Sequence, residues 1–209
     1  MTPGDLFFLA SVLLVLTLTV RIAVSMLRRR WETARRLATV LGFYLGCYAA
    51  LLIGVALARP RRILAPGERR CFDDWCAAAI TARPADGGVE QPCESGRAGR
   101  VWIATLEVSS VAKRIRQRAR DARAEIEDRV GKRYEPCAPA LKNGGDSPLS
   151  LSAEIGPGES FRLLLPFRLP AGSEPAGIVF HHGDFPGAII IGADQSFRHP
   201  PALHRLSSP

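Results

Sequence analysis

The 209-residue chain lacks three patterns that would point to a chemistry. It has no Cys-x-x-Cys pair and no histidine near its cysteines, which argues against a zinc site. It shows no recognisable Ser-His-Asp or Cys-His arrangement, which argues against hydrolases of those types. Residues 1–5 contain no lysine or arginine, which argues against a cleavable signal peptide. We therefore predict a protein that is not an enzyme and that holds neither a metal nor a cofactor.

Two long apolar runs stand at the start of the chain. Residues 6–27 are apolar except for Arg21 and a few hydroxyl side chains, and residues 37–58 form a second run. Each run reaches the ~20 residues that a helix needs to cross a bilayer core of ~30 Å. The sequence therefore predicts a transmembrane helical hairpin over residues 1–58, with the lipid bilayer as its partner. The small side chains of Ala56 and Ala58 leave cleavage after Ala58 as an alternative.

Positive charge near the apolar runs predicts the orientation of the hairpin. The hinge between the runs, residues 28–36, holds five arginines, whereas no basic residue precedes the first run. Because positive loops stay in the cytoplasm, we predict a cytoplasmic hinge and place both termini outside, in a multi-pass protein of the cell membrane. Arg59, Arg61 and Arg62 argue the opposite way. The short hinge weighs more because both helices flank it.

Small residues recur every four positions in the second run, at Gly42, Gly46, Ala50 and Gly54. Such a stripe lets two helices approach closely. We expect the first helix to pack on it, with homodimerisation through the same stripe as the second choice, and we make no prediction of oligomeric state. Cys47, in the same run, is expected to pack as a small apolar residue.

The other four cysteines, Cys71, Cys76, Cys93 and Cys137, all follow the hairpin. An even number of cysteines in a domain outside the cytoplasm indicates two disulfides. Four cysteines allow three pairings. A plausible turn between the first two leads us to predict a local Cys71–Cys76 pair and a longer Cys93–Cys137 pair.

The remaining residues suit one globular domain. The whole chain carries a net charge of +8, but the part after the hairpin carries only about +4, which does not suggest nucleic-acid binding. We predict an extended basic linker over residues 59–70, an antiparallel β-sandwich over residues 71–200 and a tail over residues 201–209. Short runs separated by glycine and proline predict its strands. These runs are residues 75–81, 101–111, 124–134 with a turn at 131–132, 149–155, 159–169, 177–182 and 188–192.

A basic stretch over residues 113–123 is the first candidate binding site. Its arginines alternate in sequence, at Arg114, Arg116, Arg118 and Arg120. On a strand this alternation places all four on one face, so we predict a strand or hairpin arm. Its functional interpretation is a surface that binds anionic lipid headgroups, envelope phosphates or a protein. A basic helix is the alternative, and a solvated edge strand is the simpler explanation of the same charges.

Histidines and an aspartate after the last long strand are the second candidate site. His181, His182 and Asp184 offer imidazole and carboxylate groups of the kind that bind metals. Adjacent residues of a strand point to opposite faces, so the two histidines are not expected to converge. A strand end followed by a Gly-Asp turn explains the same residues, and we predict no metal there.

Several turn and strand motifs resemble a known family. Asp128, Gly131 and Tyr134 form a D-x-x-G-x-x-Y pattern, a Pro-Gly-x-Ser turn follows at residues 157–160, and Phe167–Pro170 continue a long strand. Together, over about residues 101–191, they resemble an Ig-like domain family of unassigned function that is similar to mycobacterial immunoprotective extracellular antigens. The resemblance implies an all-β immunoglobulin-like sandwich, secreted or held at a membrane. It transfers no catalytic residue.

Three function classes remain after these exclusions. We favour a non-enzymatic, membrane-anchored extracytoplasmic module that binds a protein or ligand at the cell envelope. An accessory subunit that docks onto a larger membrane complex through its hairpin is the alternative. An enzyme or metal-binding domain centred on His181, His182 and Asp184 is the third.

Overall fold

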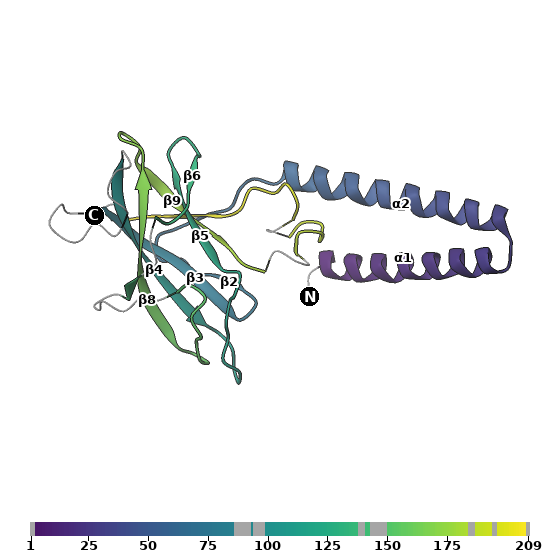
Figure 1. Cartoon of the computed structure of the whole chain (residues 1–209), viewed down its shortest axis with the longest axis horizontal. Coiled ribbons are helices and arrows are strands. Elements are labelled where there is room, and N and C mark those ends of the chain that lie inside the picture. The colour runs from purple at the N-terminus through teal and green to yellow at the C-terminus, as the bar shows by residue number, and fades with distance from the viewer. Residues whose placement is uncertain are drawn as a thin grey trace. The chain divides into compact units, whose positions relative to one another are not determined.

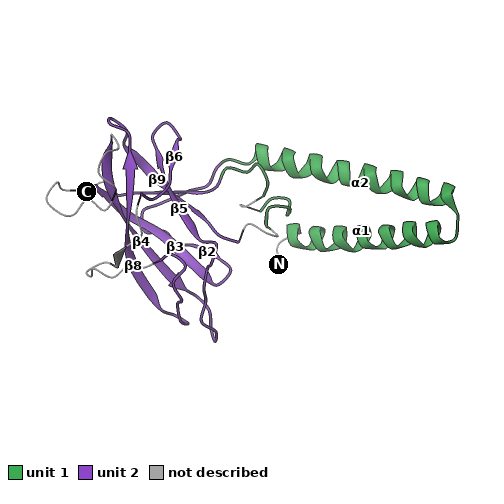
Figure 2. Ribbon diagram, in the orientation of Figure 1, with its two compact units in different colours: residues 1–60, 184–200 green, residues 61–183, 201–209 purple. Residues whose placement is uncertain are grey.

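The computed structural model describes residues 3–85, 93, 99–137, 141–142, 150–183, 187–193 and 196–207. Within them the chain forms two helices followed by ten strands (Figure 1). By its contacts the chain divides into a helical unit, residues 1–60 with 184–200, and a β unit, residues 61–183 with 201–209 (Figure 2). The elements are α1 Pro3–Leu27, α2 Trp31–Ala58, β1 Ile63–Leu64, β2 Arg70–Phe72, β3 Trp75–Pro84, β4 Arg100–Ser110, β5 Arg123–Asp128, β6 Arg133–Tyr134, β7 Leu141–Lys142, β8 Ser160–Leu169, β9 Pro175–His181 and β10 Leu203–Arg205.

The two predicted apolar helices are present as α1 and α2. Both are long and apolar enough to cross a membrane by length and composition. The connection is tighter than predicted, because α2 begins at Trp31 and takes Arg35 and Arg36 into its first turns. Arg29 makes the reversal with a φ of 55°, in the left-handed region. The arginine-rich hinge is therefore partly helical.

Tyr44 and Tyr48 of α2 provide the contacts with α1. The Tyr44 hydroxyl donates to Ser11 Oγ at 2.7 Å, and the Tyr48 ring stacks on Phe7 with centroids 5.9 Å apart. Leu52 and Ala56, spaced four residues further along α2, are buried. Residues at this spacing share one helix face, so α1 packs along the face that contains the two tyrosines.

The small-residue stripe of α2 is not the face that packs on α1, so that prediction is wrong. A Cβ atom built on Gly42, Gly46 or Gly54 would meet nothing within 4 Å. The stripe lies two residues out of phase with the tyrosine face, which at 3.6 residues per turn places it on the other side of the helix. Cys47 is free and exposed, rather than packed as predicted.

The β unit consists of two five-stranded sheets, in the order β1-β10-β9-β5-β6 and β2-β3-β4-β8-β7. Antiparallel pairing dominates, and β3, β4, β5, β8 and β9 confirm five of the predicted strand regions. The residues of the predicted linker contribute β1 and the start of β2, and the residues of the predicted tail contribute β10. The start of β1, the end of β9 and the start of β10 lie at one end of their sheet, because β1 and β10 are parallel and β9 is antiparallel to β10.

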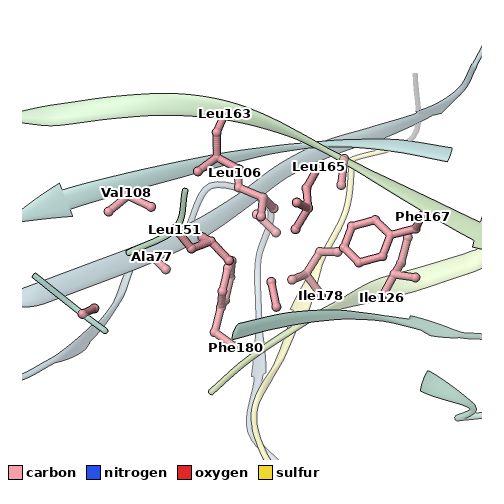
Figure 3. Close-up of a cluster of buried hydrophobic side chains, with 14 of the residues drawn as sticks. Ala77, Leu106, Val108, Ile126, Leu151, Leu163, Leu165, Phe167, Ile178 and Phe180 are labelled. Carbon is pink, nitrogen blue, oxygen red and sulfur yellow. The ribbon is translucent and has the colours of Figure 1, made fainter. Parts of the chain in front are cut away.

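The core lies between the sheets (Figure 3). In strand β8 the side chains of every second residue, Leu163, Leu165, Phe167 and Leu169, are buried on one face, as the period of a strand requires. Ile126, Ile178 and Phe180 of the opposite sheet meet them, as Figure 3 shows. Removal of these side chains from water is the main stabilising contribution to the sandwich.

Three predicted strands are absent from the described residues. Residues 111–122 carry the chain from β4 in one sheet to β5 in the other, so they cannot follow a ladder; their one strand-like contact is the bridge Gln117–Ile155. Residues 150–155 make a turn, with the Ala153 N–H donating to the Ser150 carbonyl at 2.9 Å. Residues 187–193 also form turns, closed by bonds such as Ile190 N–H to the Gly187 carbonyl at 3.2 Å. Leu149, the first residue of the predicted strand 149–155, lies outside the described residues.

Both predicted disulfides are present. Cys71 and Cys76 are direct cross-strand partners in the β2–β3 hairpin, with Cα atoms 3.9 Å apart. The intervening turn uses Asp73 at a φ of 54°, a conformation that aspartate tolerates better than most residues. Cys93 pairs with Cys137 across 44 residues, with Cα atoms 5.3 Å apart.

Candidate functional site

The motif around Asp128 is a structural turn. Asp128 Oδ1 accepts the N–H groups of Val130 and Lys132 at 3.1 and 2.8 Å, and its Oδ2 accepts the Tyr134 hydroxyl at 2.9 Å. Gly131 takes the turn position with a φ of 83°. Burial pushes the pKa of Asp128 upward, but these hydrogen bonds outweigh it and hold the pKa below its usual value. The D-x-x-G-x-x-Y motif is therefore explained by one carboxylate, that of Asp128, which closes the β5–β6 hairpin.

Glu127, the neighbour of Asp128, is an ion-pair centre that sequence reasoning missed. Its side chain is 5% exposed, and the carboxylate accepts Arg61 Nη2 at 2.8 Å and Arg133 Nε at 3.0 Å. Arg61 also donates to the Pro201 carbonyl at 2.8 Å. These bonds join the segment before β1, the β5–β6 hairpin and the residues before β10. No local spacing in the sequence signals such a contact, because Arg61 lies 66 residues from Glu127.

The four alternating arginines do not form one face, so the predicted basic strand is wrong. The basic loop, residues 111–122, is instead fixed against the turn after residue 150. Arg116 Nε lies 2.7 Å from Glu154 Oε1, and Arg118 Nε donates to the Ser152 carbonyl at 3.2 Å. The buried Ala112 and Ala119 anchor the loop in the sandwich. Two of the four arginines therefore hold the loop in place.

Other cations of the basic loop remain uncompensated. Lys113, Arg114, Arg120 and the adjoining Arg123 are exposed and carry no ion pair within the described part of the chain. Two apolar side chains accompany them, with Ile115 71% exposed and Val111 53% exposed. Cations beside exposed apolar side chains suit an acidic partner that also offers some apolar surface.

His181 and His182 diverge, as the period of a strand requires. His181 Nε2 lies 3.4 Å from Glu125 Oε2 on the neighbouring strand. His182 Nδ1 contacts Asp121 Oδ1, and its ring packs edge-on to Trp75 with centroids 5.3 Å apart. Asp184 lies outside the described residues. Among the residues that the structure describes, no group of three potential ligands comes together to hold a metal.

Asp121 connects the basic loop to the end of β9. Its Oδ2 accepts the Gly183 N–H at 2.9 Å. That bond is the main cause of the lowered pKa of Asp121; burial opposes it, and the contact with His182 adds to the lowering. The histidine thus has a packing role: it and Gly183 fix the end of the loop that carries the free cations.

Comparisons with known proteins give structural likenesses of low identity. No family model matches the chain, and no curated protein matches it significantly. Three solved structures share part of its shape. The secreted protein MPT63 of Mycobacterium tuberculosis has a TM-score of 0.44 and 17% identity, over 60% of this chain and 93% of that one. An uncharacterised β-sandwich protein of Clostridium difficile gives 0.41 and 13%, over 59% and 89%. A conserved hypothetical protein of Bacillus anthracis gives 0.38 and 10%, over 58% and 91%.

Proposed function

We propose that the chain is a membrane-anchored, extracytoplasmic β-sandwich module of immunoglobulin-like type, without enzymatic activity, that binds a partner at the cell envelope. The observation that carries the proposal is the apolar surface of the hairpin. Leu13 is 65% exposed and Phe43 is 75% exposed, on helices whose apolar windows are only 6% and 11% buried in the structure. A core helix of a soluble protein would be mostly covered, and a lipid bilayer supplies the missing cover.

The distribution of charge and of cysteines supports the orientation. Arg28, Arg29 and Arg30 lie at the turn between the helices, and Arg35 and Arg36 follow within the first turns of α2. Positive charge at this end favours a cytoplasmic turn. Two disulfides in the β unit suit the oxidising side of the membrane. Both lines favour a β unit outside the cytoplasm.

The basic loop is the surface we assign to the binding function. Its free cations and exposed Ile115 favour an acidic protein or an anionic envelope polymer. Because Arg116 and Arg118 hold the loop in place, the contacting residues are Lys113, Arg114 and Arg120. Exchange of these three for glutamine should abolish retention of an envelope partner by the intact chain, whereas exchange of exposed Arg129 should not.

Cysteine accessibility tests the anchor and its orientation together. We would place single cysteines by Glu32→Cys at the hinge and Glu174→Cys in the β unit, in a Cys47→Ala background with the disulfides oxidised. Both glutamates are well exposed, with side chains at 93% and 55%. In spheroplasts an impermeant maleimide should label the cysteine at 174 and reach the one at 32 only after permeabilisation. The reverse pattern, or labelling of both without permeabilisation, would contradict the topology.

An accessory subunit of a larger membrane complex is the second candidate, favoured by the open small-residue stripe of α2. A Cβ atom at Gly42, Gly46 or Gly54 has nothing within 4 Å, so another helix could approach there. Purification in mild detergent separates the two candidates. Co-purification of an integral membrane partner that is lost on Gly46→Leu would favour the subunit, and a lone monomeric particle would speak against it.

A further inference from the structure

The chain between β9 and β10 is unusually apolar for a connection. We define the return segment as residues 187–193 and 196–200, which belong to the helical unit by their contacts. Its first part reads Gly-Ala-Ile-Ile-Ile-Gly-Ala. Within it Ile189 is 38% exposed, and Phe197 is 54% exposed. An apolar connection that is neither strand nor core requires another explanation.

Side chains of α2 fix the backbone of the return segment. The Tyr48 hydroxyl donates to the Ile189 carbonyl at 2.7 Å. Arg59, just after the helix, donates through Nη1 to the Gly192 carbonyl. The segment also closes on itself, since the Phe197 N–H donates to the Ala188 carbonyl at 2.8 Å. These carbonyls are therefore satisfied without water, which is what a low-polarity environment demands of irregular backbone.

The position of Tyr48 along α2 gives the depth of the segment. Tyr48 precedes Ala58, the last residue of α2, by ten residues. At ~1.5 Å per residue its Cα lies ~15 Å below the end of the helix. A tyrosine side chain and its 2.7 Å hydrogen bond together reach roughly 9 Å, so the Ile189 carbonyl lies about 6 Å or more below the end of the helix. If α2 spans the bilayer, this is the depth at which interfacial segments bury their apolar face, ~5–10 Å into the headgroup and acyl boundary.

Two arginines lie beside the apolar side chains of the return segment. Arg198 places its guanidinium carbon 5.5 Å from the centroid of the Phe197 ring, and Arg59 lies against Gly192. Phe197 with an adjoining arginine matches the boundary of a bilayer, where aromatic rings lie at headgroup level and cations meet lipid phosphates. In a purely apolar contact with another protein, burial of the arginine beside Phe197 would cost desolvation free energy.

We propose that the return segment is a second membrane contact of this chain: Ile189 and Phe197 enter the outer leaflet, and Arg59 and Arg198 bind anionic lipid headgroups. The proposal rests on the membrane anchor proposed above. It adds that the β unit is held to the lipid surface by its own chain and not only through the residues that follow α2.

Depth measurements on the full chain test the proposal. Nitroxide labels would be attached through Ile189→Cys or Phe197→Cys, in a Cys47→Ala background, with the protein in vesicles of phosphatidylcholine and phosphatidylglycerol. Leu14→Cys in α1 and Glu174→Cys in the β unit serve as the membrane and aqueous controls. The accessibility of each label to oxygen and to a water-soluble nickel chelate gives its depth. We expect positions 189 and 197 below the phosphates but shallower than position 14, with position 174 in water.

The controls separate this proposal from the anchor itself. A nickel-accessible label at position 14 would refute the anchor. A buried label at position 14 with positions 189 and 197 as nickel-accessible as position 174 would refute the return-segment contact alone. Labels at 189 and 197 shielded from both oxygen and nickel would indicate a protein partner in place of lipid, and would also refute it.

A charge variant tests the headgroup contact separately. Arg198 has a φ of 71°, so Arg198→Asn removes the charge with a residue that tolerates this backbone. We expect the label at 197 to lie deeper in vesicles with phosphatidylglycerol than in vesicles of phosphatidylcholine alone. In Arg198→Asn this difference should shrink at least twofold. An equal depth in both lipids for the parent chain would refute the role of anionic headgroups.

Discussion

His204 lies wholly inside the sandwich, on β10, with its ring edge-on to Phe180 at a centroid distance of 4.8 Å. Burial, with the nearby charge of Arg70 as the second cause, lowers the pKa of His204 to about 4 against an opposing effect of Glu68. The imidazole is therefore neutral in the folded protein at neutral pH. An unfolded chain restores the ordinary pKa of ~6.5, so folding and protonation are linked.

The first prediction follows from that linkage. Between about pH 6.5 and the folded pKa of about 4, the unfolded chain binds the His204 proton and the folded chain does not, so stability falls as pH falls. The loss should approach roughly 3 kcal/mol across this window. Unfolding in detergent, followed by tryptophan fluorescence, would measure it, with His204→Phe as the comparison. A parent chain that keeps the same stability from pH 6.5 to 4 would contradict the assignment.

Glu127 and Glu174 form a matched pair for a second prediction. Both pair with arginine, but Glu127 is buried between Arg61 and Arg133, whereas Glu174 and Arg129 are exposed. Glu127→Ala should cost ~3 kcal/mol of unfolding free energy, because it strands two partly buried guanidinium groups. Glu174→Ala should cost at most ~0.5 kcal/mol. Equal losses in denaturant titrations of the two variants would show that burial does not set the difference.

Protonation of Glu127 should lower the unfolding free energy in a more acidic pH range than protonation of His204. Burial raises the pKa of Glu127, but hydrogen bonds and charge from Arg61 and Arg133 outweigh burial and hold the pKa below its usual value. A carboxyl group with a depressed pKa stabilises the fold above its unfolded pKa and loses that contribution as pH falls through the folded value. The stability that Glu127 contributes is therefore lost below about pH 4.5. Most of the loss linked to His204 is already complete at that pH.

Sequence reasoning recognised the residues of local motifs and missed those of distant contacts. Asp128, Gly131 and Tyr134 lie within one hairpin, so their spacing in the sequence is enough to indicate a turn motif. Nothing in the sequence connects Arg61 with Glu127, or Arg116 with Glu154, because folding alone brings such residues together. The alternation of four arginines was therefore interpreted as one strand face, when two of them hold a loop in place.

At the scale of elements, the two disulfides should differ in strength. The Cys71–Cys76 bond closes a loop of 5 residues and the Cys93–Cys137 bond a loop of 44. A chain-entropy estimate gives a stabilisation of about 2 kcal/mol for the short loop and about 4 kcal/mol for the long one. Double alanine variants of each pair, compared by thermal unfolding under non-reducing conditions, would measure the difference. A larger loss for the 71–76 pair would contradict the entropic account.

Strand β10 approaches β9 so closely that Gly177 has no room for a side chain. A Cβ atom there would lie 2.5 Å from the His204 carbonyl oxygen and 2.7 Å from Leu203 Cδ1. We predict that Gly177→Ala destabilises the chain by more than ~1 kcal/mol, because backbone must shift to relieve the clash. Ala176→Gly, which adds no volume at the neighbouring position, is the control. Denaturant midpoints would measure both, and an unchanged midpoint for Gly177→Ala would contradict the packing described.

The strands that the sequence predicted well each have at least one long partner in their sheet. Strands β4 and β8 are long and largely apolar and pair with each other along ten register pairs, so both could be predicted from their composition. Residues 111–122 and 150–155 have strand-like composition but no ladder, because they carry the chain between sheets or around a turn. Composition reports which residues can form a strand, whereas the topology decides which of them find a partner.

At the scale of the whole molecule, the sequence indicated the helical hairpin and the sandwich but not how the chain is shared between the units. Residues 188–192 have the composition of a buried strand, and they contact α2 instead. The tail after residue 200 was expected to be peripheral, yet β10 stands between β1 and β9 in its sheet. Apolarity alone cannot distinguish a segment that packs in a sandwich from one that packs at the end of a hairpin.

The contacts of the return segment with Tyr48 and Arg59 have a consequence for proteolytic shedding. Arg61 and Arg62 offer trypsin sites between α2 and β1, and a cut there severs the covalent link between hairpin and sandwich. The return segment, which stays part of the severed fragment, would still contact α2 and the lipid surface. We predict that the cleaved sandwich sediments with membranes at physiological salt, and that Phe197→Ser releases it into the supernatant. Release of the parent fragment on cleavage would show that the covalent link is its sole attachment.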